Sequence, residues 1–350
     1  MKGMILAAGF GTRFRPATFE IPKPLIPLAN RPLIGWVLEA MLEAGVRGVV
    51  VNLHHLPEPL EQWLGSAYRG RCEFVFSREE QILGTGGGIR RVRQHLEGEP
   101  FVLANGDTVQ SPPFGRLVAA LEAESALATL LLRHPPLHDR FTSVFFDGRF
   151  VTGFGSGTGE ALMFAGAHAF SPQIFEHLPD TEVSGITEDV YIPMVGRGEE
   201  ALAGLVHDGM WFDIGTPSRY LEATGAVLTA MGEGSLAVTP GSKITGGSLV
   251  ADGSRADGEV ASSVLGEAAE VREGGVVSRS VLWEGATVDR DSKIESSILG
   301  RGVVLPRGVR VRNALICRRI EGVDYPRETL MLGEWVAAPV LAGDVRLEGF

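Results

Sequence analysis

The hydrophobic pattern over the first two thirds of the chain alternates between short apolar runs and longer amphipathic segments. Gly48–Leu53 (GVVVNL) and Phe101–Asn105 (FVLAN) are short and continuously apolar until their last residues, which is typical of strands buried on both faces. Pro32–Ala44 has helical periodicity and is followed by Gly45, a common helix stop. The alternation predicts an α/β fold with a Rossmann-like, mostly parallel sheet and helices on both faces. The other predicted elements are the strands Gly3–Ala8, Ala126–Leu132 and Leu162–Phe170 and a closing helix, Pro217–Met231.

The pattern changes near residue 232, where helical periodicity stops and glycine, serine and valine become frequent. Three similar blocks then follow one another, beginning at Ser263 (SVLGEAAEV), Ser280 (SVLWEGATV) and Ser297 (SILGRGVVL), and each starts 17 residues after the last. A weaker copy begins at Ser248. We therefore place a domain boundary between residues 231 and 232.

Small aliphatic residues recur about every six positions within these blocks, as in Val281, Val288 and Ile294. This spacing predicts a solenoid in which three short strands form one coil and each coil buries the aliphatic residues of the next. It resembles the hexapeptide left-handed parallel β-helix, and the alternative is a β-sandwich with irregular turns. The tail from about Pro326 onward is expected to cap the open end.

Charge and cysteine content narrow the classes of function. The net charge is -11, which argues against a nucleic-acid-binding surface but not against a small anionic ligand in a local positive pocket. No stretch approaches the ~18 apolar residues that a membrane span requires, and the apolar start is too short for a signal peptide. Cys72 and Cys317 lie far apart and suggest no disulfide framework or metal knuckle. We expect a cytoplasmic protein that contacts no membrane.

The richest chemical signal is the segment LAAGFGTRFRP, which follows the first predicted strand. Gly9 and Gly11 allow a tight turn whose N–H groups face an anion, and Arg13 supplies a fork of donors for phosphate oxygens. The motif continues with a Pro-Lys-Pro segment. Its Lys23 is the only lysine between residues 3 and 242, and the flanking prolines restrict its backbone.

Two alternatives to a phosphate-binding turn account for less of this segment. A dinucleotide-binding GxGxxG requires a third glycine, but Phe14 occupies that position. A structural turn with surface arginines would account for the loop in isolation, but not for the added Pro16 and Pro-Lys-Pro spacing.

The stretch LAAGFGTRFRPATFEIPKPLIPLANRPLI resembles the signature of sugar-1-phosphate nucleotidyltransferases, the nucleotide-sugar pyrophosphorylases. The resemblance implies that residues 1–231 are the catalytic domain and that residues 232–350 are the β-helix with its cap. It implies an enzyme that joins an NTP and a sugar 1-phosphate with Mg²⁺ and releases pyrophosphate. Arg13, Lys23 and Asp107 are the implied catalytic residues. The nucleotide-binding residues implied in the first loop are Leu6, Ala7, Ala8, Gly9, Gly11, Thr12 and Arg13.

Two aspartates complete this constellation. Asp107 follows the predicted strand FVLAN, at the carboxyl end where open α/β sheets bind ligands, and Asp213 precedes the closing helix. Two carboxylates from distant segments suit Mg²⁺, and the resemblance assigns the metal to both. The structural alternatives are that Asp107 is a turn residue and that Asp213 is a helix-proximal cap.

A glycine run and several later residues are assigned by the same resemblance. Thr85, Gly86, Gly87 and Gly88 precede an arginine-rich helix and would contact the base and ribose. The sugar-phosphate side would be formed by Lys23, Arg140, Gly166 and Glu188. From the residues alone, the glycine run could be a plain loop and the arginines a solvated helix face. The segment with Glu188 could be a helix start capped by Thr187. His168 is expected to be a packed strand residue.

The chain departs from the family pattern on this side. Many members carry Glu-Lys-Pro before the strand at Leu162–Phe170, and its lysine binds the sugar phosphate, but residues 154–160 (FGSGTGE) contain no lysine. A Tyr-Gly pair that often touches the sugar is replaced by Phe141-Thr142. Arg140 is the nearest candidate for the missing charge.

Four substrate and function alternatives follow. The overall resemblance favours a mannose-1-phosphate guanylyltransferase-like enzyme that uses GTP, and the glycine run also resembles uridylyltransferases acting on amino-sugar or glucose phosphates. A non-catalytic regulatory subunit would lack the arginine, lysine or aspartates that are present here. An acyl-transferring β-helix would need a histidine, and none occurs after His207. The β-helix is therefore expected to support a homo-oligomer.

Overall fold

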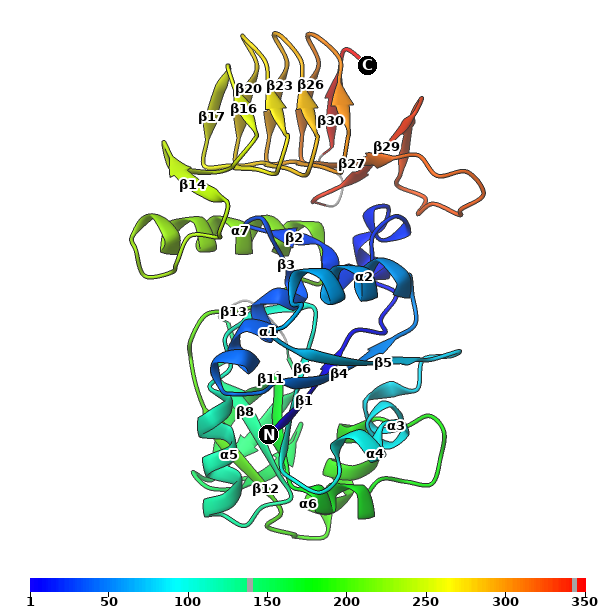
Figure 1. The fold of residues 1–350 in the computed structure, drawn as a ribbon, viewed down its shortest axis with the longest axis vertical. Helices are drawn as coiled ribbons and strands as arrows, with labels where there is room; N and C mark the ends of the chain where they lie inside the picture. Colours follow the sequence, from blue (N-terminus) through cyan, green and yellow to red (C-terminus); the bar gives the residue numbers. More distant parts are fainter. Residues whose placement is uncertain (137–140, 342–344) are drawn as a thin grey trace. The chain divides into compact units, whose positions relative to one another are not determined.

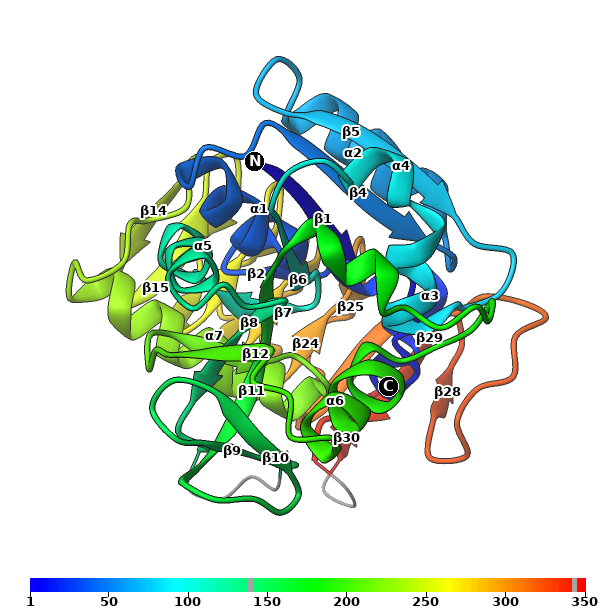
Figure 2. The ribbon, with the colours of Figure 1, turned by 90° about the horizontal axis from the view of Figure 1, so that it is seen from below.

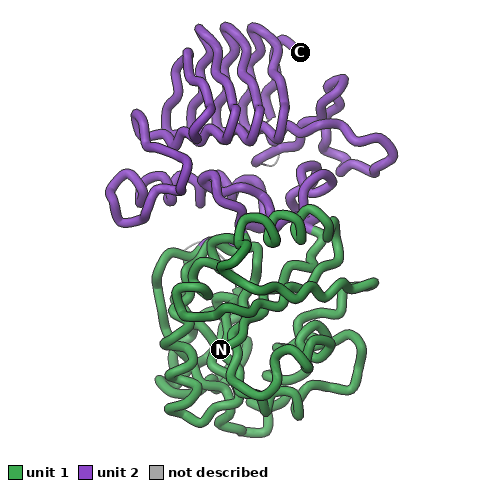
Figure 3. Tube along the Cα trace, viewed as in Figure 1, with its two compact units in different colours: residues 1–10, 34–211 green, residues 11–33, 212–350 purple. Residues whose placement is uncertain are grey.

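The computed structural model describes residues 1–136, 141–341 and 345–350, which divide into two compact units. The first unit comprises residues 1–10 and 34–211, and the second comprises residues 11–33 and 212–350 (Figure 3). The second unit therefore contains both the predicted β-helix and a short segment from the N-terminal motif.

The first unit is built on a nine-stranded sheet (Figure 1). Its main path runs β10-β9-β11-β6-β1-β4-β5, and β8 joins β11 to β12. Strands β1, β4, β5 and β6 are mutually parallel, β12 is parallel to β8, and β11 is antiparallel to both β6 and β8. The bounds are β1 Lys2–Leu6, β4 Gly48–Leu53, β5 Glu73–Arg78, β6 Phe101–Asn105, β8 Ala128–Arg133, β9 Ser143–Phe146, β10 Val151–Phe154, β11 Glu160–Phe170 and β12 Leu202–Val206.

Helices cover both faces of this sheet, as its continuously buried strands require. On one face, Met4 of β1 shares a core with Ile89 of α3 and Tyr191. On the other, the α-carbon of Gly3 faces Met41 of α1. The β9–β10 hairpin lies at one end of the sheet (Figure 2). The helices are α1 Leu33–Glu43, α2 Pro57–Ala67, α3 Gly84–Arg91, α4 Arg93–Leu96, α5 Phe114–Ala123 and α6 Ile192–Gly196.

Most predicted elements of this unit are confirmed, and two local predictions are wrong. The observed bounds of β4 and β6 equal the predicted ones, whereas β8 begins two residues later and ends one residue later than predicted. The glycine run does not precede its helix as a loop, because α3 itself begins at Gly84. Thr187 does not cap a helix: it lies inside the π-helical turn Thr187–Tyr191, whose N-cap residue is Ile186.

The second unit contains helix α7 (Pro217–Gly232) and a parallel β-helix, which confirms the predicted fold class and excludes the sandwich. Three sheets run along the coil, and each strand pairs in parallel with the strand one coil later (Figure 1). Val264 pairs with Val281, and Ile298 pairs with Leu315, so the 17-residue spacing is the length of one coil. The three sheets contain β15 Ser248–Ala251, β18 Val264–Leu265, β21 Val281–Leu282, β24 Ile298–Leu299 and β27 Ala314–Arg318; β16 Arg255–Ala256, β19 Glu270–Val271, β22 Thr287–Val288 and β25 Val304–Leu305; and β17 Glu259–Ala261, β20 Val276–Ser278, β23 Lys293–Glu295 and β26 Arg310–Arg312.

A ladder of buried serines explains why each repeat begins with this residue. The Oγ of Ser263 accepts a hydrogen bond from the N–H of Ser280, and the Oγ of Ser280 accepts one from the N–H of Ser297, at 3.0 and 3.1 Å. Each hydroxyl also donates to the carbonyl two residues earlier. The coil interior is filled by stacked aliphatic residues such as Leu282 and Val288. Serine is thus used where a buried corner N–H needs an acceptor.

The tail from Pro326 continues the sheets of the last coil with antiparallel strands. β29 (Trp335–Pro339) pairs with β27, β28 (Leu330–Leu332) pairs with β29, and β30 (Arg346–Glu348) pairs with β26. These strands cover edges that would otherwise expose unpaired backbone groups, as expected of a cap. Within the described residues, no helix combines the length and apolar character needed to cross a membrane.

The serine ladder predicts a specific loss of stability. Ser280→Ala leaves the buried N–H of Ser297 without its acceptor, so the free energy of unfolding should fall by about 1–3 kcal/mol. Denaturant-induced unfolding measures this change. Ser235→Ala, at an exposed site, is the control and should stay within about 0.5 kcal/mol of wild type. Equal stability of the two variants would show that the ladder is dispensable.

Candidate functional site

The first loop begins where β1 ends, and a buried amide holds it there. The backbone N–H of Ala7 donates to Oδ1 of Asn52, at 2.8 Å. The Nδ2 of Asn52 donates in turn to Oε1 of Glu79, also at 2.8 Å, and both polar side chains are at most 5% exposed. Asn52 thereby fixes the start of the loop to β4 and to the residue after β5.

The same carboxylate reaches the glycine-rich helix. Oε2 of Glu79 accepts the N–H of Leu83, which precedes α3, at 3.0 Å. Gly88 lies against this network, since a Cβ there would approach the Glu79 carboxylate to 3.4 Å and the Asn52 amide to 3.5 Å. One continuous network therefore links Ala7 to the N-terminal part of α3, and so brings two predicted nucleotide-contacting segments together.

The glycine run is also shaped by packing. The N–H groups of Gly86 and Gly87 both donate to the carbonyl of Ser184, at 2.9 and 3.2 Å. A Cβ on Gly86 would lie 2.6 Å from Ser184 Oγ, and one on Gly87 would lie 2.3 Å from the carbonyl of Glu182. Gly86, Gly87 and Gly88 are buried and Thr85 is half-buried. The close approach of the Glu182–Ser184 backbone therefore requires glycine here, independently of any ligand.

Asp107 lies in the turn after β6, at the carboxyl edge of the sheet. The N–H of the preceding Gly106 donates to the carbonyl of Leu6 at 2.9 Å, which ties this turn to the end of β1. Two residues before Asp107, the Asn105 amide faces Gly166, which has a φ of 80° and would place a Cβ 2.7 Å from Nδ2. Asp107, Leu6 and Gly166, three predicted site residues, therefore converge in the first unit.

The second unit holds the rest of the N-terminal motif. Gly11 has a φ of 61°, and its carbonyl accepts both the N–H of Phe14 and the hydroxyl of Thr18, each at 2.9 Å. A Cβ at Gly11 would lie 2.8 Å from Thr18 and 3.1 Å from Cβ of Lys23. Lys23, in the short 3₁₀ turn Lys23–Leu25, is only 7% exposed. The structure thus packs the predicted lysine against the predicted loop glycine.

Arg13 and the segment of Asp213 also come together within this unit. Arg13 is exposed in the 3₁₀ turn Thr12–Phe14, and its guanidinium lies against Gly215, where a Cβ would approach Nη1 to 2.8 Å. Asp213 ends the strand β13 (Trp211–Asp213), two residues earlier. A larger residue at position 215 would require the guanidinium of Arg13 to move.

The segment that carries Arg13 and Lys23 is supported by α7 and the β-helix. Tyr220 of α7, which is fully buried, donates to the carbonyl of Pro27 and accepts a hydrogen bond from the indole of Trp283 at 3.1 Å. Phe14 packs edge-on against Tyr220, with ring centroids 5.6 Å apart. The Nδ2 of Asn30 donates to the carbonyl of Leu265 at 3.0 Å. The β-helix therefore contributes to positioning the motif.

The predicted sugar-side residues are not all brought together. Glu188 is exposed in the π-helical turn, and Arg140 lies outside the described residues. His168 is a packed strand residue, as predicted: it is buried, and its Nδ1 pairs with the hydroxyl of Tyr191 at 2.9 Å. Burial lowers the pKa of His168 to about 3, which keeps the imidazole neutral.

No preformed metal cluster accompanies these residues. In the described ranges, no group of three or more His, Cys, Asp or Glu side chains could hold a metal ion. Cys72 and Cys317 are free thiols.

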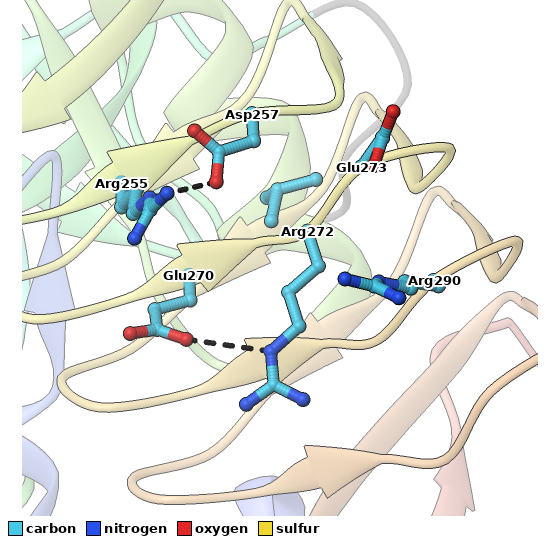
Figure 4. A pocket seen from close by; sticks show the side chains of 7 residues that line it. Arg255, Asp257, Glu270, Arg272, Glu273 and Arg290 are labelled. Carbon is cyan, nitrogen blue, oxygen red and sulfur yellow. Dashed lines mark ion pairs between the residues drawn. The ribbon is translucent and has the colours of Figure 1, made fainter.

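A polar pocket on the β-helix lies outside the predicted constellation (Figure 4). Four of its charged side chains form two ion pairs: Arg255 with Asp257, at 2.7 Å, and Arg272 with Glu270, at 3.6 Å. Arg272 also pairs with Asp289. Because acids and bases balance, this pocket offers no net charge to a ligand, and we interpret it as a solvated face of the coil.

Sequence reasoning missed Asn52 and Glu79, the two residues that hold the loop and α3. Both sit at or just after strand ends and carry polar side chains at most 5% exposed. The only sequence signal was the polar Asn52 within the otherwise apolar run GVVVNL, because a buried amide requires partners.

Comparison with known proteins follows the two-part organisation. Residues 2–230 match the family described as "Nucleotidyl transferase", and residues 235–316 match "GlmU-like, C-terminal hexapeptide". N-acetylmuramate alpha-1-phosphate uridylyltransferase of Neisseria meningitidis is 35% identical over 234 residues, covering 64% of this chain and 96% of that protein. Mannose-1-phosphate guanyltransferase of Hypocrea jecorina is 28% identical over 262 residues, covering 69% of this chain and 68% of that protein.

A solved structure shows the same fold for about two thirds of the chain. HddC from Yersinia pseudotuberculosis superimposes with a TM-score of 0.54 at 21% identity, covering 64% of this chain and 98% of HddC. Its complex with GMP-PN gives a TM-score of 0.55 at 20% identity.

The buried network around Asn52 predicts a stability effect. Asn52→Ala removes the acceptor of the Ala7 N–H and the donor to Glu79, so the free energy of unfolding should fall by about 1–3 kcal/mol. Denaturant-induced unfolding measures the change, and Gln94→Ala, at an exposed site of the same unit, is the control. A loss no greater than that of the control would contradict a structural role for the network.

Proposed function

The chain belongs to the nucleotidyl transferase family and is a sugar-1-phosphate nucleotidyltransferase, and we propose that it uses GTP and mannose 1-phosphate with Mg²⁺. The observation that supports this substrate choice is the length of the chain. The matched region is 69% of this chain and 68% of the Hypocrea jecorina guanyltransferase, so the two chains are nearly equal in length. The match to the Neisseria uridylyltransferase covers 96% of that protein but 64% of this chain, so that protein is the shorter of the two.

A uridylyltransferase acting on an amino-sugar phosphate is the second candidate. The Neisseria relative has the higher identity of the two, 35% over 234 residues. We place the catalytic domain at residues 1–231 and the β-helix with its cap at residues 232–350. We also propose a cytoplasmic location, to which two free cysteines are suited.

The proposed reaction is an in-line displacement at phosphorus. A phosphate oxygen of the sugar 1-phosphate forms a bond to the α-phosphorus of the NTP, and the bond from that phosphorus to the bridging oxygen of pyrophosphate breaks. The nucleophile is already an anion, so no general base is required. The protein must bring two anions together and stabilise the charge that develops during transfer. Arg13 would serve the leaving phosphates, and Lys23 the reacting phosphate.

The metal assignment rests on donor chemistry. Mg²⁺ prefers oxygen ligands and commonly takes one or two carboxylates together with substrate phosphates, so Asp107 and Asp213 fit it without a larger protein cluster. When bound, the ion supplies charge neutralisation on the phosphates. Two backbone observations support the assignment: the N–H of Gly106 ties the turn before Asp107 to Leu6, and Asp213 ends β13 two residues before Gly215, against which Arg13 packs.

Pyrophosphate release tests this function. The full-length protein is assayed with Mg²⁺ and each of four NTPs against a panel of sugar 1-phosphates. Product from GTP and mannose 1-phosphate supports the first proposal, and product only from UTP and an amino-sugar phosphate supports the second. If no pair releases pyrophosphate but calorimetry detects binding of a nucleotide sugar, the result would instead indicate a non-catalytic regulatory subunit.

Two substitutions test the catalytic assignments. Asp107→Asn removes a carboxylate of the same size, and Lys23→Ala removes the buried ammonium. Each should lower kcat on the productive pair by at least about a hundredfold, the scale of a lost electrostatic contact in the transition state. Exposed Asp252→Asn and Arg116→Ala are matched controls and should leave kcat unchanged. Near-normal turnover in either test variant, with the unfolding temperature preserved, would refute its assignment.

We further propose that the β-helix mediates homo-oligomerisation through an apolar groove on its last coil and cap. The groove is lined by Val304, Met331, Trp335 and Phe350, among others. Val304, Met331 and Phe350 are each 44–52% exposed, and contiguous exposed apolar residues commonly mark an interface.

Light scattering should give a mass that is a multiple of 37.4 kDa. Met331→Glu should shift it toward the monomer, because a charge enters the apolar groove. Val183→Glu, at an equally exposed apolar site of the first unit, is the control and should not. A monomeric wild type at high concentration would exclude this interface.

A further inference from the structure

The cation that binds the phosphate of the sugar substrate is not identified by the family pattern. Residues 154–160 contain no lysine, and Arg140 lies outside the described residues. A sugar 1-phosphate is a dianion, and burying it in an active site requires a compensating positive charge. The first unit contains another arginine, Arg133, at the carboxyl edge of the sheet where Asp107 also lies. The sequence motifs did not single it out.

Sheet topology places Arg133 at the carboxyl edge of the sheet. Arg133 is the last residue of β8, which is antiparallel to β11. β6 is also antiparallel to β11, so β6 and β8 run in the same direction. Asp107 follows the carboxyl end of β6 as Arg133 ends β8. Both side chains therefore lie at the edge where open α/β sheets bind ligands.

A β-bulge connects this arginine to the predicted sugar-contacting glycine. Phe164 pairs with Leu132 and His168 with Leu130, so β11 carries extra residues around Gly166. The bulge leaves the carbonyl of Ala165 to accept the indole N–H of Trp211 at 2.9 Å. Trp211 therefore lies beside the bulge, and bulges are frequent next to active sites.

The guanidinium of Arg133 rests on this tryptophan. Its carbon is 5.3 Å from the Trp211 ring centroid, and Phe141 packs edge-on against the same ring at 5.6 Å. Nη1 donates to the carbonyl of Gly209 at 3.1 Å, and Nε donates to the carbonyl of His134 at 3.3 Å. These contacts fix the orientation of the fork, and its other N–H groups donate to no described residue.

The charge of Arg133 is incompletely compensated. Both of its hydrogen-bond acceptors are neutral carbonyls. The nearby Asp208 carboxylate is occupied by His134, which donates its backbone N–H and places Nδ1 2.7 Å from Oδ2. Burial lowers the pKa of Arg133, and Asp208 offsets this only in part. Within the described ranges no carboxylate forms an ion pair with Arg133, and a half-buried cation of this kind is the electrostatic arrangement expected of an anion site.

We propose that Arg133 binds the phosphate of the sugar 1-phosphate, in place of the lysine that other members of the family carry, and that Trp211 holds its guanidinium in position. The inference rests on the proposed function for its substrate class. An arginine fork can contact two phosphate oxygens at once, so it is chemically suited to this replacement.

The test compares Arg133→Met, which keeps the aliphatic stem on Trp211, with Arg133→Lys, which keeps the charge. On the productive pair, Arg133→Met should raise KM for the sugar 1-phosphate at least about tenfold, the loss expected for one charge-assisted hydrogen bond. KM for the NTP should stay within about twofold, and Arg133→Lys should recover part of the loss. Arg140→Met is the matched control and should have the smaller effect.

Inhibition by the unphosphorylated sugar separates phosphate binding from a structural role. If Arg133 contacts the phosphate, Arg133→Met leaves the inhibition constant of the free sugar unchanged; if it only supports Trp211, that constant rises too. An unchanged KM for the sugar 1-phosphate, a parallel rise for the NTP, or a larger effect of Arg140→Met would overturn the proposal.

Calorimetric titration of the sugar 1-phosphate distinguishes failure of this proposal from failure of the proposed function. If wild type is inactive but binds the sugar 1-phosphate, the proposed function fails, and a loss of binding in Arg133→Met still supports the role of Arg133. If wild type is active and Arg133→Met binds as tightly as wild type, only the role of Arg133 fails. Absence of binding to wild type would refute both.

Discussion

The position of the first loop depends on one buried side-chain amide, Asn52. It accepts a hydrogen bond from the N–H of Ala7, just after β1, and donates one to the Glu79 carboxylate. This carboxylate also accepts a hydrogen bond from the N–H of Leu83, which precedes α3. Polar groups buried this deeply are expensive to leave unpaired, so each bond constrains the others. The strand ends of β1, β4 and β5 and the start of α3 are thus fixed as a set, and Gly88 lies within van der Waals contact of this network.

The β-helix has a second role besides any contribution to assembly. Residues 11–33 pack with α7 and the coil, through Tyr220, Trp283 and Asn30. The predicted domain boundary lies where the hydrophobic periodicity of the sequence changes, whereas the two compact units are defined by contacts in the structure. The segment with Arg13 and Lys23 belongs to the predicted catalytic domain by its position in the sequence, but to the second compact unit by its contacts. A change in the first coils of the β-helix therefore has a physical route to residues proposed for catalysis.

Sequence patterns predicted the elements whose cause is local. β4 and β6 are continuous apolar runs, and their predicted bounds equal the observed ones. The serine-led repeat gave the coil length because each coil repeats the same contacts. The missed features have distant causes. The glycine run is helical and packs on Ser184, about a hundred residues later, and Arg133 gains its setting from Trp211 and a bulge in β11. No local pattern reports such contacts.

The coil's constant register has a consequence for how proteins of this kind can change in length. Ser263, Ser280 and Ser297 occupy equivalent positions, and each hydroxyl serves the residue one coil later. Loss or duplication of one whole coil would leave every remaining serine facing a suitable neighbour, whereas a change of a few residues would misalign all later coils. Insertions and deletions in this region are therefore expected to comprise whole coils. The distance from α7 to the cap would then change by the height of one coil at a time.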